Sequence, residues 1–300
     1  MEFVVTNKEA NNRLDKALSL FYKDKSRSFF TKAFENNLVA VNGIISKPSL
    51  KVKVGDVISF SLPIDESDNI EAEDIPLNII YEDDEILIID KPQGLVVHPA
   101  AGHWKGTLVN AILNHCNNLS KINGKFRPGI VHRIDKDTSG LICSAKNDNS
   151  HRILAEQLKD HTMHREYMAL VKGVINENSG TIDMPIARHK GNRLKMDVDK
   201  DGKNAITNFK VIERYKNHTL ISLNLVTGRT HQIRVHMSKI GHPVEGDPLY
   251  YGKQYDTLYK DGQLLTAIKL TLIHPTTKKE MTFETKLPPY FEEILDKLSK

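Results

Sequence analysis

An acidic stretch divides this 300-residue chain and constrains its fold more than any other feature of the sequence. Residues 65–90 contain eleven Asp or Glu and no Lys or Arg. The part from Ile64 to Pro76 also lacks the apolar periodicity of a helix or a strand, which is typical of a linker. The sequence therefore predicts two bodies, residues 1–64 and 79–300, joined by an acidic linker over residues 65–78.

Both predicted bodies are basic. Residues 1–64 carry a net charge of +4 and residues 91–300 a net charge of +11, although the whole chain has only +4. Two basic bodies around an acidic connector fit a polyanion that is bound at two places. Lysine-rich surfaces also serve solubility alone, so the charge by itself does not establish a ligand.

The first body is predicted to be a helix pair with a small sheet. Apolar residues at helical spacing indicate a helix from Arg13 to about Tyr22, and Ser26 or Ser28 can cap a second helix. Short strands are expected over residues 38–41 and 56–62.

The second body is predicted to have an α+β fold with a mixed, largely antiparallel sheet. Its strands outnumber its helices and do not alternate strictly with them, which argues against a doubly wound parallel sheet. Strands are expected over residues 85–90, 140–145, 167–171, 206–215, 218–226 and 265–274, and helices over residues 108–115 and 149–159 and within 229–240.

The sequence contains no sign of secretion or of a membrane span. Met1 to Leu14 lack the basic start and apolar stretch of a signal peptide, and no later run approaches the ~20 apolar residues of a membrane span. Cys116 and Cys143 have no Cys-x-x-Cys spacing, so we interpret both as ordinary thiols. We therefore expect a cytoplasmic protein.

The thirteen histidines raise the question of a metal site. Two pairs that are close in the sequence are His161 with His164 and His231 with His236. Neither pair has a cysteine or a third ligand at a suitable spacing, so we expect no metal site.

The densest polar segment runs from His132 to Gly140, between the apolar pair Ile130-Val131 and the predicted strand 140–145. A polar loop between two buried anchors is a usual place for catalytic groups. The same residues can equally form a capped turn in which Gly140 takes a positive φ, and spacing alone does not decide between the two.

Two other enzyme classes can be compared with this segment. The run His-Arg-Ile-Asp is similar to the His-Arg-Asp loop of protein kinases, but the kinase Asp directly follows Arg and the other kinase motifs are missing. A glycosidase would need Asp135 and Asp137 about 5–9 Å apart, which the sequence cannot establish.

The segment from His132 to Gly140 resembles the RluA-type RNA pseudouridine synthases, and within them the RluD-like members that carry an N-terminal RNA-binding module. Residues 1–64 resemble that module, which is of the alpha-L type. Four further stretches support the resemblance in the expected order: Asp90–Pro99, Gly106–Ala111, Tyr167–Gly173 and Thr227–His236.

The resemblance implies an isomerase that needs no cofactor and converts uridine to pseudouridine. It implies that Asp135 is the catalytic carboxylate, that Arg133 belongs with the flipped-out nucleotide, that Tyr167 faces the uracil and that Arg234 pairs with Asp135. A neighbouring guanidinium favours the ionised form of a carboxylate and holds it in place. In isolation, Tyr167 would be a core strand residue and Arg234 a surface helix residue.

Five polar residues in the first body correspond to positions where the alpha-L module meets RNA: Arg13, Lys16, Arg27, Ser28 and Lys32. Such groups would contact phosphates and give salt-dependent affinity with little base specificity. The alternative is an ordinary solvated helix face.

The resemblance to RluD-like members implies large-subunit ribosomal RNA as the substrate, with transfer RNA as an open alternative. A non-catalytic RNA-binding protein on the same fold is the competing class, and we expect a monomer. Three departures from the family pattern bear on the exact uridine target: Thr266 replaces a usual His, Arg165 a usual Lys, and the stretch from Asp247 to Gly252 is one residue longer than the common form.

Overall fold

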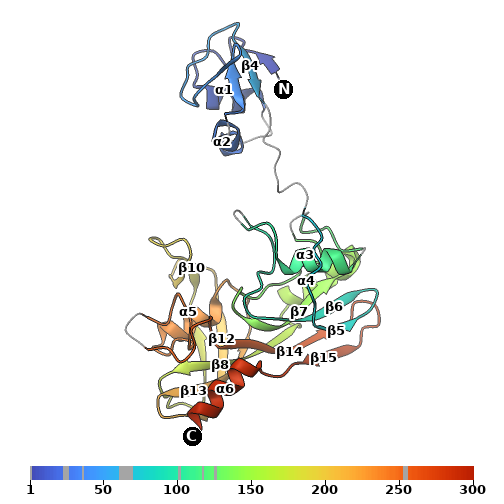
Figure 1. Cartoon of the computed structure of the whole chain (residues 1–300), viewed down its shortest axis with the longest axis vertical. Coiled ribbons are helices and arrows are strands. Elements are labelled where there is room, and N and C mark those ends of the chain that lie inside the picture. Colours follow the sequence, from blue (N-terminus) through green and yellow to red (C-terminus); the bar gives the residue numbers. More distant parts are fainter. Residues whose placement is uncertain are drawn as a thin grey trace. The chain divides into compact units, whose positions relative to one another are not determined.

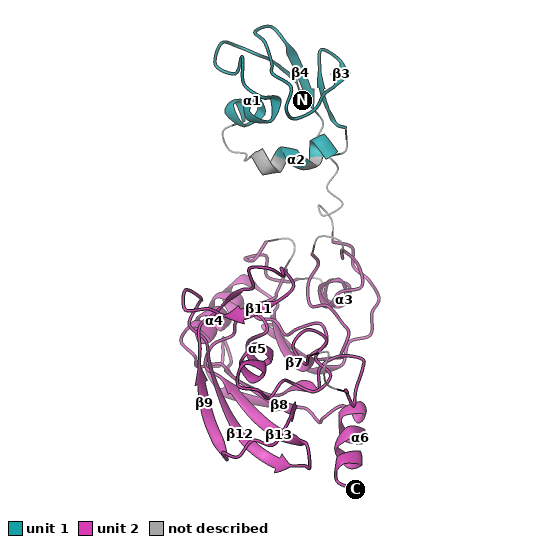
Figure 2. Cartoon of the chain, turned by 90° about the vertical axis from the view of Figure 1, so that its left-hand side faces the viewer, with its two compact units in different colours: residues 1–69 teal, residues 70–300 magenta. Residues whose placement is uncertain are grey.

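The computed structural model describes residues 2–22, 27–35, 37–60, 70–100, 103–116, 118–124, 127–252 and 256–300. Contacts between Cα atoms divide the chain into two units, residues 1–69 and 70–300 (Figure 2). Among the described residues, no helix is both long and apolar enough to span a membrane.

The first unit is built from a short helix pair and a small antiparallel sheet, as predicted. Leu14, Ala17 and Leu18 are buried at helical spacing and form a core with Phe30 and Ile58. Its described sheet has the order β1-β4-β2-β3. The elements are β1 (Glu2–Val4), α1 (Leu14–Phe21), α2 (Arg27–Glu35), β2 (Val39–Val41), β3 (Ile44–Ile45) and β4 (Val57–Phe60).

The described part of the second unit builds a nine-stranded sheet with the order β5-β6-β7-β14-β8-β13-β12-β9, in which β15 pairs with β14 (Figure 1). All of its strand pairs are antiparallel except β7 with β14, so the α+β prediction is confirmed. The strands are β5 (Ile79–Glu82), β6 (Ile86–Lys91), β7 (Ser139–Ala145), β8 (His164–Lys172), β9 (Ser179–Asp183), β12 (Ile206–Arg214), β13 (His218–Leu225), β14 (Leu265–Ile273) and β15 (Glu280–Glu284).

Helices cover both faces of this sheet. On one face, α3 (Leu108–His115) and α5 (Gln232–Lys239) bury side chains with Ile142 and Leu265 of the sheet. On the other face, α4 (Asp148–Lys159) and α6 (Pro289–Leu298) contribute to two smaller cores. A separate hairpin of β10 (Ile186–Arg188) and β11 (Met196–Val198) lies between β9 and β12 in the chain.

The predicted linker is only partly a connector. Residues 70–78 belong to the second unit, where the Asn110 side chain donates to the Glu71 carbonyl at 2.8 Å. The Glu73 carboxylate accepts from the amide of Gly106 at 3.0 Å. Part of the acidic run is therefore used to hold the start of α3, because its backbone and side-chain oxygens accept hydrogen bonds there.

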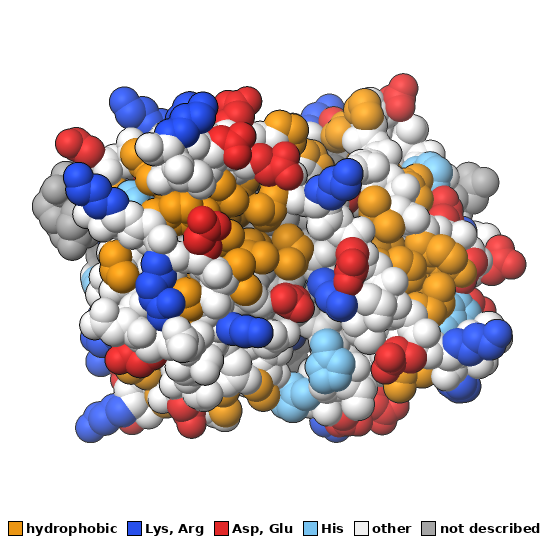
Figure 3. Space-filling model, turned by 90° about the horizontal axis from the view of Figure 1, so that it is seen from below, with side chains coloured by type: hydrophobic (Ala, Val, Ile, Leu, Met, Phe, Trp, Pro, Cys, Tyr) orange, Lys and Arg blue, Asp and Glu red, His pale blue; other side chains and the backbone are white. Residues whose placement is uncertain are grey.

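Charged side chains of both signs are interspersed on the face shown in Figure 3, around two hydrophobic areas. Positive charge does not gather there. The net basic charge of the chain is therefore not concentrated on this face.

Gly140 joins the polar loop to the centre of the sheet. It lies in β7, has φ +105°, and pairs with Ala267 in the parallel contact between β7 and β14. A Cβ atom at this position would lie 2.2 Å from the Ala267 carbonyl oxygen. Only glycine allows the two strands to approach this closely directly after the loop.

We expect Gly140→Ala to lower the free energy of unfolding by about 2–5 kcal/mol, because it adds both backbone strain and overpacking. Urea unfolding followed by the fluorescence of Trp104, the single tryptophan and a residue of the second unit, measures this loss. Gly241→Ala is the matched control, because its φ is also positive, at +88°, but its Cβ would contact no atom. The control should lose about 1–2 kcal/mol. Equal losses in the two variants would contradict the packing account.

Candidate active site

Asp135 lies in the loop between Ile130 and β7, with its carboxylate at a pocket. Oδ2 accepts a hydrogen bond from Nη1 of Arg234 at 2.9 Å, and Oδ1 lies 3.9 Å from Nε2 of His231. The Asp135 side chain is 17% exposed, so a ligand can reach it. The contact between Asp135 and Arg234 that the resemblance implied is present.

Arg234 projects from α5 and is bound by two carboxylates. Its Nε and Nη2 donate to the two oxygens of Asp247 at 2.6 and 2.9 Å, which leaves Nη1 for Asp135. The Oδ1 atom of Asp247 also accepts from the backbone amides of Leu249 and Tyr250. Burial alone would lower the pKa of Arg234, but Asp247 and then Asp135 raise it above its ordinary value. The guanidinium is therefore a fixed cation.

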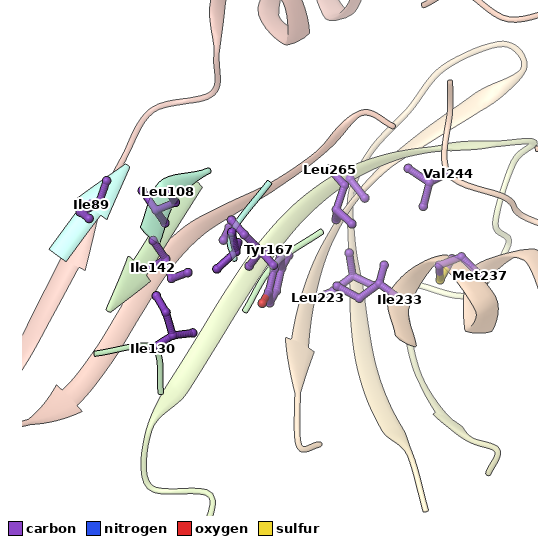
Figure 4. Close-up of a cluster of buried hydrophobic side chains, with 14 of the residues drawn as sticks. Ile89, Leu108, Ile130, Ile142, Tyr167, Leu223, Ile233, Met237, Val244 and Leu265 are labelled. Carbon is purple, nitrogen blue, oxygen red and sulfur yellow. The ribbon is translucent and has the colours of Figure 1, made fainter. Parts of the chain in front are cut away.

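Tyr167 lies in β8 among buried side chains that include Ile142, Leu223 and Leu265 (Figure 4). Burial raises the pKa of its phenol, and the charge of Asp135 also raises it, while the nearby charge of Arg165 acts in the opposite direction. The phenol is therefore neutral at ordinary pH and can donate a hydrogen bond. Tyr167 is at once the core residue expected from its strand position and a wall of the pocket beside Asp135.

Arginines dominate the polar wall of this pocket. Arg133, Arg165, Arg229 and Arg234 line it, and among the described residues a single carboxylate, that of Asp135, lies beside them. The lining also includes the apolar or small residues Ile134, Leu225, Gly228, Ile233 and Leu265 and the polar residues Thr138, Thr230, His231 and Gln232. The surplus of positive charge makes the pocket suited to an anionic ligand with a flat apolar part.

Arg133 is exposed at the edge of the pocket. Its Nη1 lies 3.3 Å from Nε2 of His98. Burial lowers the pKa of His98 to about 4, and the nearby charges of Arg133 and Arg127 act in the same direction. His98 is therefore neutral near pH 7 and can accept the hydrogen bond from the guanidinium.

Two buried side chains hold the loop that carries Asp135. The Nζ atom of Lys91 donates to the carbonyl oxygens of Pro92, Leu95 and Lys136 at 2.8 to 2.9 Å. At the start of the loop, Nε2 of His132 accepts from the Cys143 amide at 3.0 Å. The loop is thus attached both to the turn after β6 and to β7.

Sequence reasoning gave no role to Lys91, His132 or Asp247. Lys91 and His132 lie in stretches that support the family resemblance, and Asp247 begins the stretch that departs from the common form. The local sequence does not show that these three side chains are buried and bonded to the loop, to β7 and to Arg234. Asp137, the second carboxylate considered for a glycosidase, does not line the pocket beside Asp135. Thr266, which departs from the family pattern, bonds Ser139 at 2.9 Å and so supports the end of the loop.

One group among the described residues has the spacing of metal ligands: Glu82, His115 and Cys116. Cys116, which the sequence suggests is an ordinary thiol, lies beside His115 and Glu82. The Glu82 carboxylate already accepts from His115 at 2.7 Å and from Lys146 at 2.9 Å. The Glu82 carboxylate thus joins the His115 ring to the Lys146 ammonium group.

The polar residues predicted to meet RNA in the first unit are only partly described. Arg13 and Lys16 are exposed at the start of α1, where Nε of Arg13 lies 3.3 Å from Asp15. The side chains of Arg27, Ser28 and Lys32 lie outside the described part of the chain.

His132 should make stability depend on pH. Burial lowers its pKa from 6.5 to about 3, so the unfolded chain takes up a proton below pH 6.5 while the folded chain does not. Acidification from about pH 7 to about pH 4 should therefore destabilise the wild type relative to His132→Gln, by at most about 1.4 kcal/mol per pH unit. Urea unfolding of both proteins across this range measures the difference. A difference independent of pH would contradict a neutral buried His132.

Comparison with known proteins gives two family matches. Residues 85–239 match the model of RNA pseudouridylate synthases, and residues 12–58 match the S4 domain. An uncharacterized RNA pseudouridine synthase of Bacillus subtilis is 45% identical over 300 residues, which covers all of this chain and 98% of the relative. A ribosomal large subunit pseudouridine synthase D of Zymomonas mobilis is 42% identical and covers 92% of this chain and 90% of the relative.

A solved structure shares the fold over about three quarters of this chain. Human RNA pseudouridylate synthase domain containing 4 superposes with a TM-score of 0.58 at 23% identity, over 74% of this chain and 93% of that chain. At this identity the likeness concerns the fold.

Proposed function

The chain belongs to the RNA pseudouridine synthase family, and from this premise we propose that Asp135 is the catalytic group with which it isomerises specific uridines of large-subunit ribosomal RNA. The observation that carries this proposal is the position of Asp135: it supplies the single carboxylate of the pocket wall and is held there by Arg234. The enzyme is an isomerase, because pseudouridine and uridine have the same atoms.

The reaction requires a carboxylate next to the ribose and the base. It breaks the bond between ribose and the ring nitrogen and rejoins the base through a ring carbon, with no net oxidation or reduction. An ionised carboxylate can attack as a nucleophile or remove a proton, and Asp135 is placed for either step. Arg234 keeps this carboxylate in one orientation, since Asp247 fixes the guanidinium from behind.

Base flipping brings the uridine to Asp135. A stacked uracil hides its sugar carbon, so the enzyme must swing it out of the RNA at a cost of a few kcal/mol. We assign Arg133 to the space that the base vacates, because it is exposed at the edge of the pocket and two residues from Asp135. Tyr167 then offers a flat face and a neutral phenol to the flipped uracil.

The substrate assignment rests on the relatives and on the first unit. Relatives 41–42% identical over more than nine-tenths of this chain are named ribosomal large subunit pseudouridine synthase D. The S4 domain provides a second RNA-binding body, to which exposed Arg13 and Lys16 contribute positive charge. We place the enzyme in the cytoplasm as a monomer. Modification of transfer RNA is the alternative substrate.

Tritium release tests the proposal. Ribosomal and transfer RNA transcripts are labelled on the uracil carbon that becomes bonded to ribose, and release is compared between wild type and Asp135→Asn. We expect release from large-subunit ribosomal RNA by the wild type and a loss of at least about a hundredfold in the variant, because the amide can neither attack nor accept the proton.

Asp137→Asn is the matched control, since it removes a carboxylate two residues away that does not line the pocket. It should release tritium at nearly the wild-type rate. An active Asp135→Asn variant would refute the role of Asp135. Tritium release from transfer RNA alone would refute the assignment of ribosomal RNA as the substrate. Binding of ribosomal RNA without any tritium release would favour a non-catalytic RNA-binding protein.

A further inference from the structure

Arg165 is a buried cation whose place in the pocket the folded chain does not explain. It lies in β8, is 9% exposed, and lines the same pocket as Asp135. Within the described residues, it takes part in no ion pair with a carboxylate, and its Nε is buried without a hydrogen-bond partner. A buried charge without a counter-ion costs several kcal/mol, so such groups are kept where a ligand completes them.

The strand directs Arg165 toward the place of the substrate. Side chains alternate along β8, so Arg165 and Tyr167 share the face that lines the pocket, while Glu166 between them bonds Ser222. Gly228 lines the same pocket, and a Cβ atom there would lie 2.9 Å from Nη1 of Arg165. The absence of a side chain at Gly228 leaves the space that the guanidinium occupies.

The other cations of the pocket already have partners. Arg234 is bound by Asp135 and Asp247, and Nε of Arg229 donates to the Asn204 carbonyl at 2.9 Å. Arg133 contacts the neutral His98 at the edge. Arg165 is thus the cation of the pocket wall that is both buried and without a protein acceptor among the described residues.

We propose that Arg165 binds a phosphate group of the RNA that flanks the target uridine; this inference rests on the proposed function. RNA supplies one full negative charge for each nucleotide, and a guanidinium fork matches the oxygens of a phosphate. Two positions along a strand, about 6.6 Å, separate Arg165 from Tyr167. With the uracil at Tyr167 and the ribose at Asp135, a backbone phosphate of the same nucleotide falls beside Arg165.

The first test measures binding of a large-subunit ribosomal RNA transcript as a function of salt, in the Asp135→Asn background so that no uridine is converted. We expect Arg165→Met to weaken binding about tenfold or more and to reduce the salt slope by about one. Arg152→Met, on the exposed face of α4, is the matched control and should change neither quantity as much. Thermal unfolding of Arg165→Met should not fall below the parent, because the variant removes an unpaired buried charge.

The second test identifies the phosphate. A stem-loop around the uridine that the wild type converts receives a neutral methylphosphonate at one of its two flanking phosphates. One of the two methylphosphonates should weaken binding by the Asp135→Asn protein. The same methylphosphonate should not weaken binding further when Arg165→Met is also present. A methylphosphonate several nucleotides away should affect both proteins equally. The assignment would be overturned if the loss of affinity from Arg165→Met and the loss from each flanking methylphosphonate were fully additive. Unchanged binding by Arg165→Met would also overturn it.

Gly228→Ala gives an independent variant that leaves the charge in place. The added methyl group would displace the guanidinium, so binding should weaken in the parent and weaken no further in Arg165→Met. Unchanged binding by Gly228→Ala would contradict the position assigned to Arg165. The salt measurement reports binding alone and does not depend on turnover. If the enzyme released no tritium, the proposed function would be refuted, while the binding data would still decide whether Arg165 contacts RNA.

Discussion

The site depends on the guanidinium of Arg234, which binds two carboxylates at once. Asp247 binds Arg234 through both oxygens, its side chain is fully buried, and two backbone amides bond the same carboxylate. A buried ion pair offsets the cost of removing both charges from water only where its geometry is fixed and its remaining hydrogen-bond positions are filled. One nitrogen of Arg234 stays free of Asp247 and points at Asp135. The carboxylate of Asp135 is therefore oriented by a guanidinium that Asp247 holds in place.

The sheet brings these groups together, although they are distant in the sequence. Arg234 and Asp135 are separated by 99 positions, and Asp135 is delivered by a loop that leads directly into β7. Gly140 lets β7 approach β14, and β14 lies against β8, which supplies Tyr167 and Arg165. Arg234 comes from α5, which buries Ile233 in the same core as Tyr167 and Leu265. The central strands thus form part of the pocket wall, while the loop contributes Asp135 and α5 contributes Arg234.

Much of the fold could be predicted from local patterns. The helix at Leu14–Phe21, the long strands of the second unit and the class of its sheet follow from apolar spacing, which acts over a few residues. The hairpin of β10 and β11 was not predicted, because its strands are three residues each. Residues 70–78 were assigned to the linker, since their acidic composition does not reveal the hydrogen bonds that they make to α3.

The candidate site was predicted as far as the family resemblance reached. It pointed to Asp135, Tyr167 and Arg234, and the structure brings these three together at one pocket. Asp247 and Lys91 were missed, because an acidic residue before a proline and a lysine at the end of a strand have no local sign of burial. Arg165 was noticed only as a departure from the usual lysine. What these residues do depends on long-range packing, which a single sequence does not display.

Single-turnover tritium release by Arg234→Met tests the central claim most directly, because excess enzyme separates the chemical step from RNA binding. The account predicts that the rate constant falls by at least about a hundredfold, since Asp135 loses the partner that orients it. The dissociation constant for the same RNA should stay within about threefold, because the charge of Arg234 is already shared by two carboxylates. A rate constant close to that of the wild type would contradict the claim that Arg234 sets the reactive position of Asp135.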